Sequence, residues 1–353
     1  MFLPVLKSVR DCADFTLTVK PFIGQLYALP QRLADVRSLD GLSQVYVETN
    51  PLMTAFAASI LLGGIFLVAS EVNRNYSQVD RFWSLLPNLY VIHLAVWARL
   101  AGVPHGRVDL IAIFTTAWSC RLTFNYWRRG GYEIGSEDYR WEIVKSRMHP
   151  IAFFVLNLTF ISFFQSVLLF SISCLPAYVI LLSSRVEPHV SAIDIAYLTV
   201  ETLLVFSEWI SDGQQWTYQT AKRQYQKDAK LPKGWDQADL DRGFITSGLW
   251  AYSRHPNFLA EQAIWFVLYN WACQATETLY NWSFVGSASL VLLFQGSTML
   301  TESITSGKYP EYADYKKQIG MFMPTSLRGY QPPASNYTVI KSTGPARESR
   351  KQK

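Results

Sequence analysis

Residues 150–174 read PIAFFVLNLTFISFFQSVLLFSISC, which is 25 residues without a single charged side chain. A helix in a bilayer must satisfy all of its backbone amides within its own segment, so about 20 mostly apolar residues predict a membrane span. Six other segments meet or approach the same criterion. The sequence therefore predicts an all-α, polytopic membrane bundle of about seven spans, at 52–70, 82–104, 107–127, 150–174, 192–211, 257–273 and 282–301.

The composition of the whole chain favours the same class of protein. Of 353 residues, 50% are hydrophobic and only 17% are charged, against roughly 25% charged in a typical soluble domain. The net charge of +5 does not indicate a nucleic-acid partner, because the basic residues lie between apolar blocks and in the tail. Four widely spaced cysteines predict no disulfide framework, and the five histidines lack metal-ligand spacing, so no metal is expected.

Basic residues also predict the orientation of the spans. The connections 128–149 and 212–256 and the tail after residue 302 are rich in Lys and Arg, whereas 274–281 contains neither. Segments rich in Lys and Arg remain in the cytosol, and even numbers of expected spans separate these three. We therefore expect a cytosolic C-terminus and a luminal N-terminal segment, 1–51.

We expect one transmembrane domain over 52–330, with a cofactor region at about 121–325, and a disordered basic tail over 331–353. Arg350 and Lys351 resemble a dilysine-type retrieval signal, which indicates the endoplasmic reticulum membrane. Solvated tail charge is the alternative interpretation. The sequence does not indicate an oligomeric state.

Charged side chains gather at the expected cytosolic ends of the spans. Each costs a few kcal/mol in a bilayer and needs a partner or a polar cavity. Snorkelling to the interface explains any one of them but explains the set less well. Converging arginines are what a polyanionic cofactor requires, since guanidinium groups bind phosphates bidentately. The set comprises Asp80, Arg81, Arg121, Arg128, Arg129, Glu208, Asp212, Arg254, His255 and Glu261.

The most specific motif is GLWAYSRHPNFLAE at 248–261. Pro256 suits the first turn of a helix, whose start presents free amides and a positive dipole end. A plain helix cap is the alternative. The motif resembles the glycine, leucine, aromatic, tyrosine, serine, asparagine and glutamate pattern of steroid 5α-reductases. Its arginine-histidine-proline-asparagine form is shared with sterol reductases and with an uncharacterised, DUF1295-like branch.

Three other segments resemble the same superfamily: RLTFNYWRRG at 121–130, Ser211-Asp212, and the tyrosine-rich segment 309–317 followed by Pro324. Arg121 and Arg128 are seven residues apart and share a helix face, which suits a diphosphate clamp. The resemblance implies an NADPH site in which Asn257 and Glu261 read the nicotinamide amide. The implied cofactor-binding residues are Arg121, Arg128, Arg129, Asp212, Tyr252, Arg254, His255, Asn257, Glu261, Tyr312 and Tyr315.

The chain also departs from the reductase pattern. Trp118 stands where the reductases have a substrate-binding tyrosine, Glu208 replaces an asparagine, and a charged insertion occupies about 222–243. Cofactor binding is therefore better supported than the acid that polarises the substrate. Tyr126, paired with Asp80 or Glu208, is the expected catalytic proton donor.

The sequence thus predicts an NADPH-dependent reductase that moves hydride to an activated carbon-carbon double bond of a lipid such as a steroid, sterol or enoyl chain. One alternative is a membrane methyltransferase that uses S-adenosylmethionine, since such enzymes share an arginine-histidine-proline string. Another is a non-catalytic lipid-binding protein on the reductase fold. The sequence names neither the lipid nor the bond that is reduced.

Overall fold

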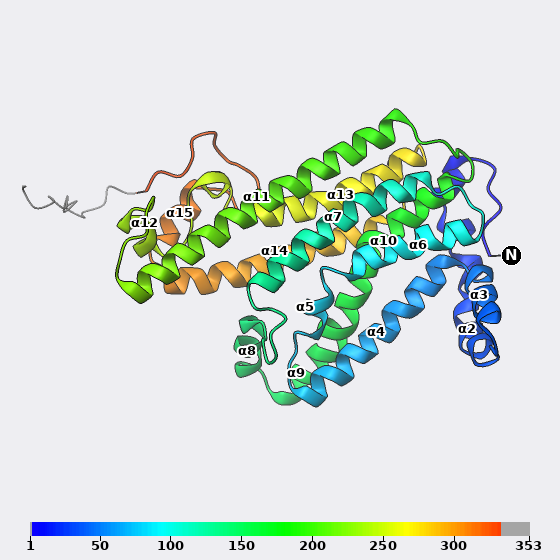
Figure 1. Ribbon diagram of the computed structural model, residues 1–353, viewed down its shortest axis with the longest axis horizontal. Coiled ribbons are helices and arrows are strands. Elements are labelled where there is room, and N and C mark those ends of the chain that lie inside the picture. The colour runs from blue at the N-terminus through cyan, green and yellow to red at the C-terminus, as the bar shows by residue number, and fades with distance from the viewer. Residues whose placement is uncertain (1, 333–353) are drawn as a thin grey trace, which may run out of the picture. The chain divides into compact units, whose positions relative to one another are not determined.

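A computed structural model describes residues 2–332 of the chain, and within that range it contains helices and connecting loops but no strand (Figure 1). The predicted all-α class is confirmed. The predicted basic tail lies outside the described residues from position 333 onward. The helices are α1 Phe15–Thr18, α2 Gly24–Ala34, α3 Leu39–Glu48, α4 Pro51–Asn73, α5 Gln78–Phe82, α6 Leu86–Leu100, α7 Gly106–Arg128, α8 Tyr139–Ser146, α9 Pro150–Leu156, α10 Gln165–Ser183, α11 Ala192–Asp228, α12 Gln237–Arg242, α13 Pro256–Ala275, α14 Phe284–Lys308 and α15 Tyr312–Gln318.

The chain forms two compact units. The first unit comprises Met1–Asp212 and Asn257–Leu300, and the second comprises Gly213–Pro256 and the chain from Thr301 onward. Helices α11 and α14 each begin in the first unit and end in the second.

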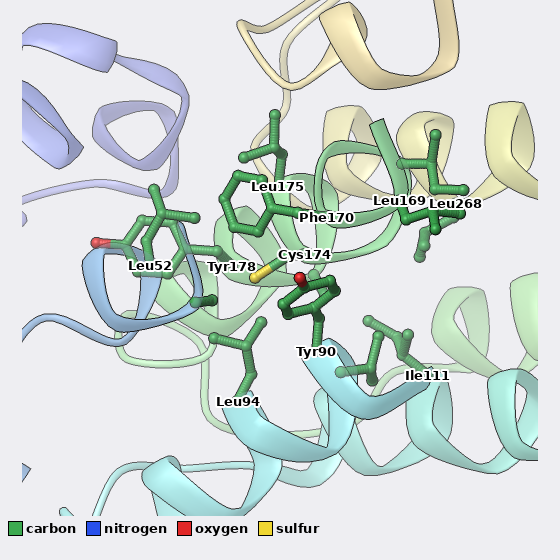
Figure 2. Packing of buried hydrophobic residues seen from close by; sticks show 14 of the residues in the cluster. Leu52, Tyr90, Leu94, Ile111, Leu169, Phe170, Cys174, Leu175, Tyr178 and Leu268 are labelled. Atoms are coloured by element: carbon green, nitrogen blue, oxygen red, sulfur yellow. The ribbon is translucent and has the colours of Figure 1, made fainter. Parts of the chain in front are cut away.

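Helix α10 forms the core of the first unit, where it packs against α4, α6 and α7. Phe170, Cys174 and Tyr178 of α10 lie beside Leu52 of α4 and Tyr90 of α6 (Figure 2), and all five are buried. In lipid, such helices associate through close packing rather than through the hydrophobic effect, so small residues gather where two backbones meet. A Cβ atom on Gly286 of α14 would lie 2.4 Å from the carbonyl oxygen of Ser171 in α10, which is why only glycine fits there.

Within residues 2–332, three helical stretches are long and apolar enough to cross a membrane, and they overlap the expected spans 52–70, 150–174 and 282–301. In the most apolar windows of α4 and α14, only 33% and 22% of the residues are buried, as expected of lipid-facing helices. The corresponding window of 150–183 is 94% buried and therefore belongs to the protein core. A π-helical segment, Asn157–Phe164, joins α9 to α10 in this stretch.

The expected count of about seven spans is not confirmed. Helix α6 has 15 residues and is about 22 Å long, short of the roughly 30 Å hydrocarbon layer. Helix α11 carries Asp194, Glu201 and Glu208 within the stretch expected to span, which lowers its hydropathy. Helix α10 extends beyond the expected span 150–174 and ends at Ser183.

The second unit is built around two groups of aromatic and aliphatic side chains. Tyr218 and Trp250 belong to one group, and Phe244, Tyr312 and Tyr315 belong to the other. The charged insertion predicted at about 222–243 contains the end of α11 and all of α12. Gly243 ends α12 with φ +85°, and a Cβ there would lie 2.1 Å from the ring of Tyr309, so this helix end requires glycine.

Candidate functional site

Helices α7, α11 and α13 bring three carboxyl groups to one buried guanidinium within the first unit. Arg121 Nη1 lies 2.6 Å from Asp212 Oδ2, while its Nη2 lies 3.0 Å from Glu208 Oε1 and 3.6 Å from Glu261 Oε2. All four residues are at most 8% exposed. We call these four residues, together with Asn257, the acidic centre.

Helical spacing explains how so few segments build this centre. Glu208 and Asp212 are four residues apart on α11, and Asn257 and Glu261 are four apart on α13, so each pair projects from one face. Pro256 is the first residue of α13, as predicted, because its fixed φ suits a helix start and its missing N–H costs nothing there. Asn257 therefore lies in the first turn of the helix.

Two tryptophans hold Glu261. The indole N–H of Trp118 donates to Oε2 at 2.9 Å, and that of Trp265 donates to Oε1 at 2.8 Å. Their rings meet edge to face at 4.9 Å, and both side chains are completely buried. Trp118, which stands in place of the expected substrate-binding tyrosine, is thus engaged with the carboxylate of Glu261.

The centre contains buried acceptors and donors that lack hydrogen-bond partners. Asn257 Nδ2 donates to Asp212 Oδ1 at 3.2 Å, which turns its amide oxygen away from that carboxylate. Asn257 Oδ1 and Glu208 Oε2, together with Nε and Nη2 of Arg121, are buried and have no hydrogen-bond partner among the described residues. Leaving such atoms unpaired costs about 1–3 kcal/mol each. The centre is therefore suited to a group that both donates and accepts hydrogen bonds, such as an amide.

Two further predicted cofactor residues lie at the end of α7. Arg128 Nη2 donates to the carbonyl oxygen of Asp212 at 3.2 Å, and its Nε donates to Asn125 Oδ1 at 2.7 Å. Arg129 Nε donates to the backbone of Asn125 at 3.2 Å, and its side chain is exposed. Arg121 and Arg128 both reach Asp212, as expected of two arginines on one helix face.

The remaining predicted catalytic residues, Tyr126 and Asp80, lie near the loop that follows α7. The ring of Tyr126 meets Tyr132 edge to face at 4.9 Å, and a Cβ on Gly131 would lie 2.4 Å from the same ring. Asp80 accepts a hydrogen bond from Trp141 Nε1 at 3.1 Å, and burial raises the pKa of its carboxyl group. Glu208 belongs to the acidic centre, whereas Asp80 belongs to the polar group around α5 and α8.

In the second unit, three of the predicted cofactor residues contact the carboxyl group of Glu302. Arg254 binds it bidentately, with Nε 2.7 Å from Oε1 and Nη2 3.1 Å from Oε2. His255 Nε2 lies 3.0 Å from Oε1, and the Tyr312 hydroxyl donates to the same oxygen at 3.2 Å. Burial raises the pKa of Tyr312, so its hydroxyl stays protonated and remains a donor at neutral pH. We call Glu302, Arg254, His255 and Tyr312 the Glu302 cluster.

Two residues of the Glu302 cluster also donate hydrogen bonds to the end of α15 and to the segment that follows it. Arg254 Nη1 donates to the carbonyl oxygens of Ile319 and Lys316, at 2.6 and 3.2 Å. The backbone N–H groups of Arg254 and His255 donate to the carbonyl oxygens of Gly320 and Met321. Arg254 thus supports the fold of this unit directly.

The last two predicted cofactor residues, Tyr252 and Tyr315, differ in exposure. The hydroxyl of Tyr315 donates to the carbonyl oxygen of Trp250, and burial raises its pKa. Tyr252 is 42% exposed.

The sequence reasoning missed two residues of these sites. Glu302 directly follows the apolar run 282–301. An acid at the end of an expected span is the feature that made Glu208 a candidate site residue. Trp265 lies four residues after Glu261 on α13, so helical spacing alone would have found it.

Apolar helices of membrane-spanning length, combined with buried polar centres, are typical of an integral membrane protein with a functional interior. The chain belongs to the family described as "Protein of unknown function (DUF1295)", whose model matches residues 65–319. It is also similar to "Uncharacterized protein C594.04c" of Schizosaccharomyces pombe, with 36% identity over 324 residues, covering 91% of this chain and 93% of the relative. No solved structure matches the chain. The matched range contains both the acidic centre and the Glu302 cluster.

Proposed function

We propose that the protein is an NADPH-dependent membrane reductase that delivers hydride to an activated carbon-carbon double bond of a lipid, such as a steroid, a sterol or an enoyl chain. The motif at 248–261 and its resemblance to steroid 5α-reductases support the cofactor. The apolar surfaces of α4 and α14 support a substrate that arrives from the bilayer. The observation that carries the proposal is the set of unpaired buried acceptors and donors in the acidic centre.

The residues of the acidic centre fit one end of the cofactor. A nicotinamide carboxamide offers N–H donors and one acceptor oxygen. An N–H would satisfy Asn257 Oδ1, and the oxygen would accept from Nε or Nη2 of Arg121. Arg121 already faces three carboxyl groups, so a neutral amide suits it better than a further anion would. Arg128 and Arg129 are the arginines of this unit that suit the phosphates.

Bound NADPH would supply the hydride, and the chain would supply positioning and a proton. Asn257 and Arg121 would bind the carboxamide and thereby orient the ring. Trp118 and Trp265 fix Glu261 and exclude water from the centre. The proton comes from Tyr126, Asp80 or Glu208, and of these Glu208 is the residue that lies in the acidic centre.

One observation favours a second function. Three carboxyl groups face one guanidinium, and such an excess of acid attracts a cation. S-adenosylmethionine carries a sulfonium and an ammonium group, so a membrane methyltransferase is the second candidate. A non-catalytic lipid-binding protein would bind neither cofactor.

We further propose that the protein resides in the endoplasmic reticulum membrane with a cytosolic C-terminus. The support is the Lys and Arg content of 128–149, 212–256 and the tail. This orientation would bring a soluble cofactor to the cytosolic side.

Calorimetric titration of detergent-purified protein with NADPH and with S-adenosylmethionine tests the assignment. We expect saturable NADPH binding that weakens about tenfold in Asn257→Ala, since one buried hydrogen bond is lost. Asn270→Ala on the same helix is the matched control, because its side-chain amide donates to the carbonyl oxygen of Phe266 within α13. Binding of S-adenosylmethionine alone would favour the methyltransferase, and binding of neither would favour the non-catalytic protein.

A further inference from the structure

Glu208 and Glu261 approach the same nitrogen atom. Arg121 Nη2 lies 3.0 Å from Glu208 Oε1 and 3.6 Å from Glu261 Oε2, while Nη1 is engaged by Asp212. If all three acids were ionised, two of these negative charges would remain unbalanced by Arg121 in a buried setting. Burying an unpaired charge is strongly unfavourable, and neighbouring carboxylates relieve it by keeping a proton.

The hydrogen bonds identify which acid keeps that proton. Glu261 accepts two indole N–H groups, which stabilise its ionised form. Asp212 accepts from Arg121 at 2.6 Å and from Asn257 at 3.2 Å. Glu208 is 4% exposed, and its Oε2 accepts no hydrogen bond from the described residues. Glu208 is thus the least stabilised carboxylate of the three.

We propose that Glu208 holds a proton in the ligand-free protein and with NADPH, and releases it when the positively charged ring of NADP⁺ lies against the acidic centre. This inference rests on the proposed function. The groups that face Glu208 are Arg121 from α7, Glu261 from α13 and Asp212 from its own helix. A cationic ring supplies the positive charge that the ionised centre lacks.

Release of the Glu208 proton also fits the complete reduction of a carbon-carbon double bond. Glu208 would give its proton to one carbon of the double bond, and bound NADPH would supply a hydride to the other carbon. Two C–H bonds would form as the double bond becomes a single bond, and the positive charge left on the oxidised ring would balance the negative charge left on Glu208. Glu208 would recover its proton from solvent once NADP⁺ leaves. Proton transfer and oxidation of the cofactor thus leave the net charge of the site unchanged.

The two redox forms of the cofactor make a matched pair for a test that needs no turnover, because they differ in ring charge and share their phosphates. Titration calorimetry in buffers of different ionisation enthalpy measures the protons released on binding. At a pH at which Glu208 is protonated in the ligand-free protein and ionised in the NADP⁺ complex, we expect about one proton to be released per NADP⁺ bound. We expect about none to be released per NADPH bound. In Glu208→Gln the release on NADP⁺ binding falls to about zero, while NADPH still binds.

Glu201→Gln is the matched control. Glu201 is a fully buried acid on the same helix, two turns before Glu208, and it lies outside the acidic centre. This variant is expected to release the proton as the wild type does. If Glu208→Gln does not fold, Glu208→Asp serves instead and should still release a proton.

Three results would overturn the inference. Equal proton release with NADP⁺ and NADPH would show that ring charge is not sensed, although nicotinamide binding itself would stand. Release that persists in Glu208→Gln would assign the proton to another residue. Absence of binding by either nucleotide would remove the proposed function as well, so the two failures are distinguishable.

Discussion

Arg254 offers the sharpest test of how the second unit is held together. Its guanidinium makes two hydrogen bonds to Glu302 and two to carbonyl oxygens near the end of α15. Arg254 and Glu302 are 9% and 6% exposed. Removing one partner of such a buried pair leaves an uncompensated charge and costs about 3–5 kcal/mol. We therefore expect Arg254→Ala to lower the free energy of unfolding by about that amount.

The unfolding of purified protein in detergent, followed by intrinsic tryptophan fluorescence, measures this loss. Lys317→Ala is the control, because Lys317 pairs with Asp314 on the surface and is 75% exposed. Exposed pairs contribute about 0–1 kcal/mol. The double variant Arg254→Met, Glu302→Leu should lose about 2 kcal/mol less than the sum of its two single variants, since neither charge is then left alone.

Two results would refute this reasoning. The first is an Arg254→Ala protein that unfolds at the same denaturant concentration as Lys317→Ala. The second is strict additivity of the single and double variants, which would mean that Arg254 and Glu302 do not interact. A stable Arg254→Ala protein that had lost NADPH affinity would instead return Arg254 to the cofactor site.

Three other predictions concern packing, cofactor choice and topology. Gly286→Ala should destabilise the protein by about 1–3 kcal/mol in the same unfolding assay, because its Cβ would press on the backbone of α10, whereas Gly296→Ala, with open space around it, should not. NADPH should bind more tightly than NADH in a calorimetric titration, because NADPH carries an additional phosphate that Arg128 or Arg129 can bind; equal affinities would remove this claim. Single cysteines placed in 128–149, 212–256 or the tail should react with an impermeant reagent in sealed microsomes, and protection of any one would overturn the orientation.

Composition was sufficient to predict the apolar helices, and the position of one proline was sufficient to predict where a helix begins. Long runs without charge, such as 150–174, have no other stable form in a bilayer. Pro256 marked the start of α13, and helical spacing placed Asn257 and Glu261 on one face. The count of spans was less predictable, because α7 and α11 combine apolar stretches with buried ion pairs that only the folded chain can satisfy.

The partners of the site residues could not be predicted, because they are distant in sequence. Arg121 meets acids from α11 and α13, 87 to 140 positions away, and local spacing carries no information about such contacts. Trp118 suggested a lost substrate contact, yet the structure engages it with Glu261. The predicted cofactor contact of Arg254 and His255 stays a prediction, and their pairing with Glu302, 47 to 48 positions away, could not be read from local spacing.

Transfer of deuterium from NADPH to a lipid tests the central proposal most directly. Purified protein in lipid nanodiscs would be incubated with membrane lipid extract and NADPH deuterated at the transferred position, and the lipids would be analysed by mass spectrometry. We expect one lipid to gain two hydrogens, one of them deuterium, with a reduced yield in Asn257→Ala and an unchanged yield in Asn270→Ala. A lipid extract without deuterium in any species, together with NADPH that remains unoxidised, would contradict the assignment of this protein as a reductase.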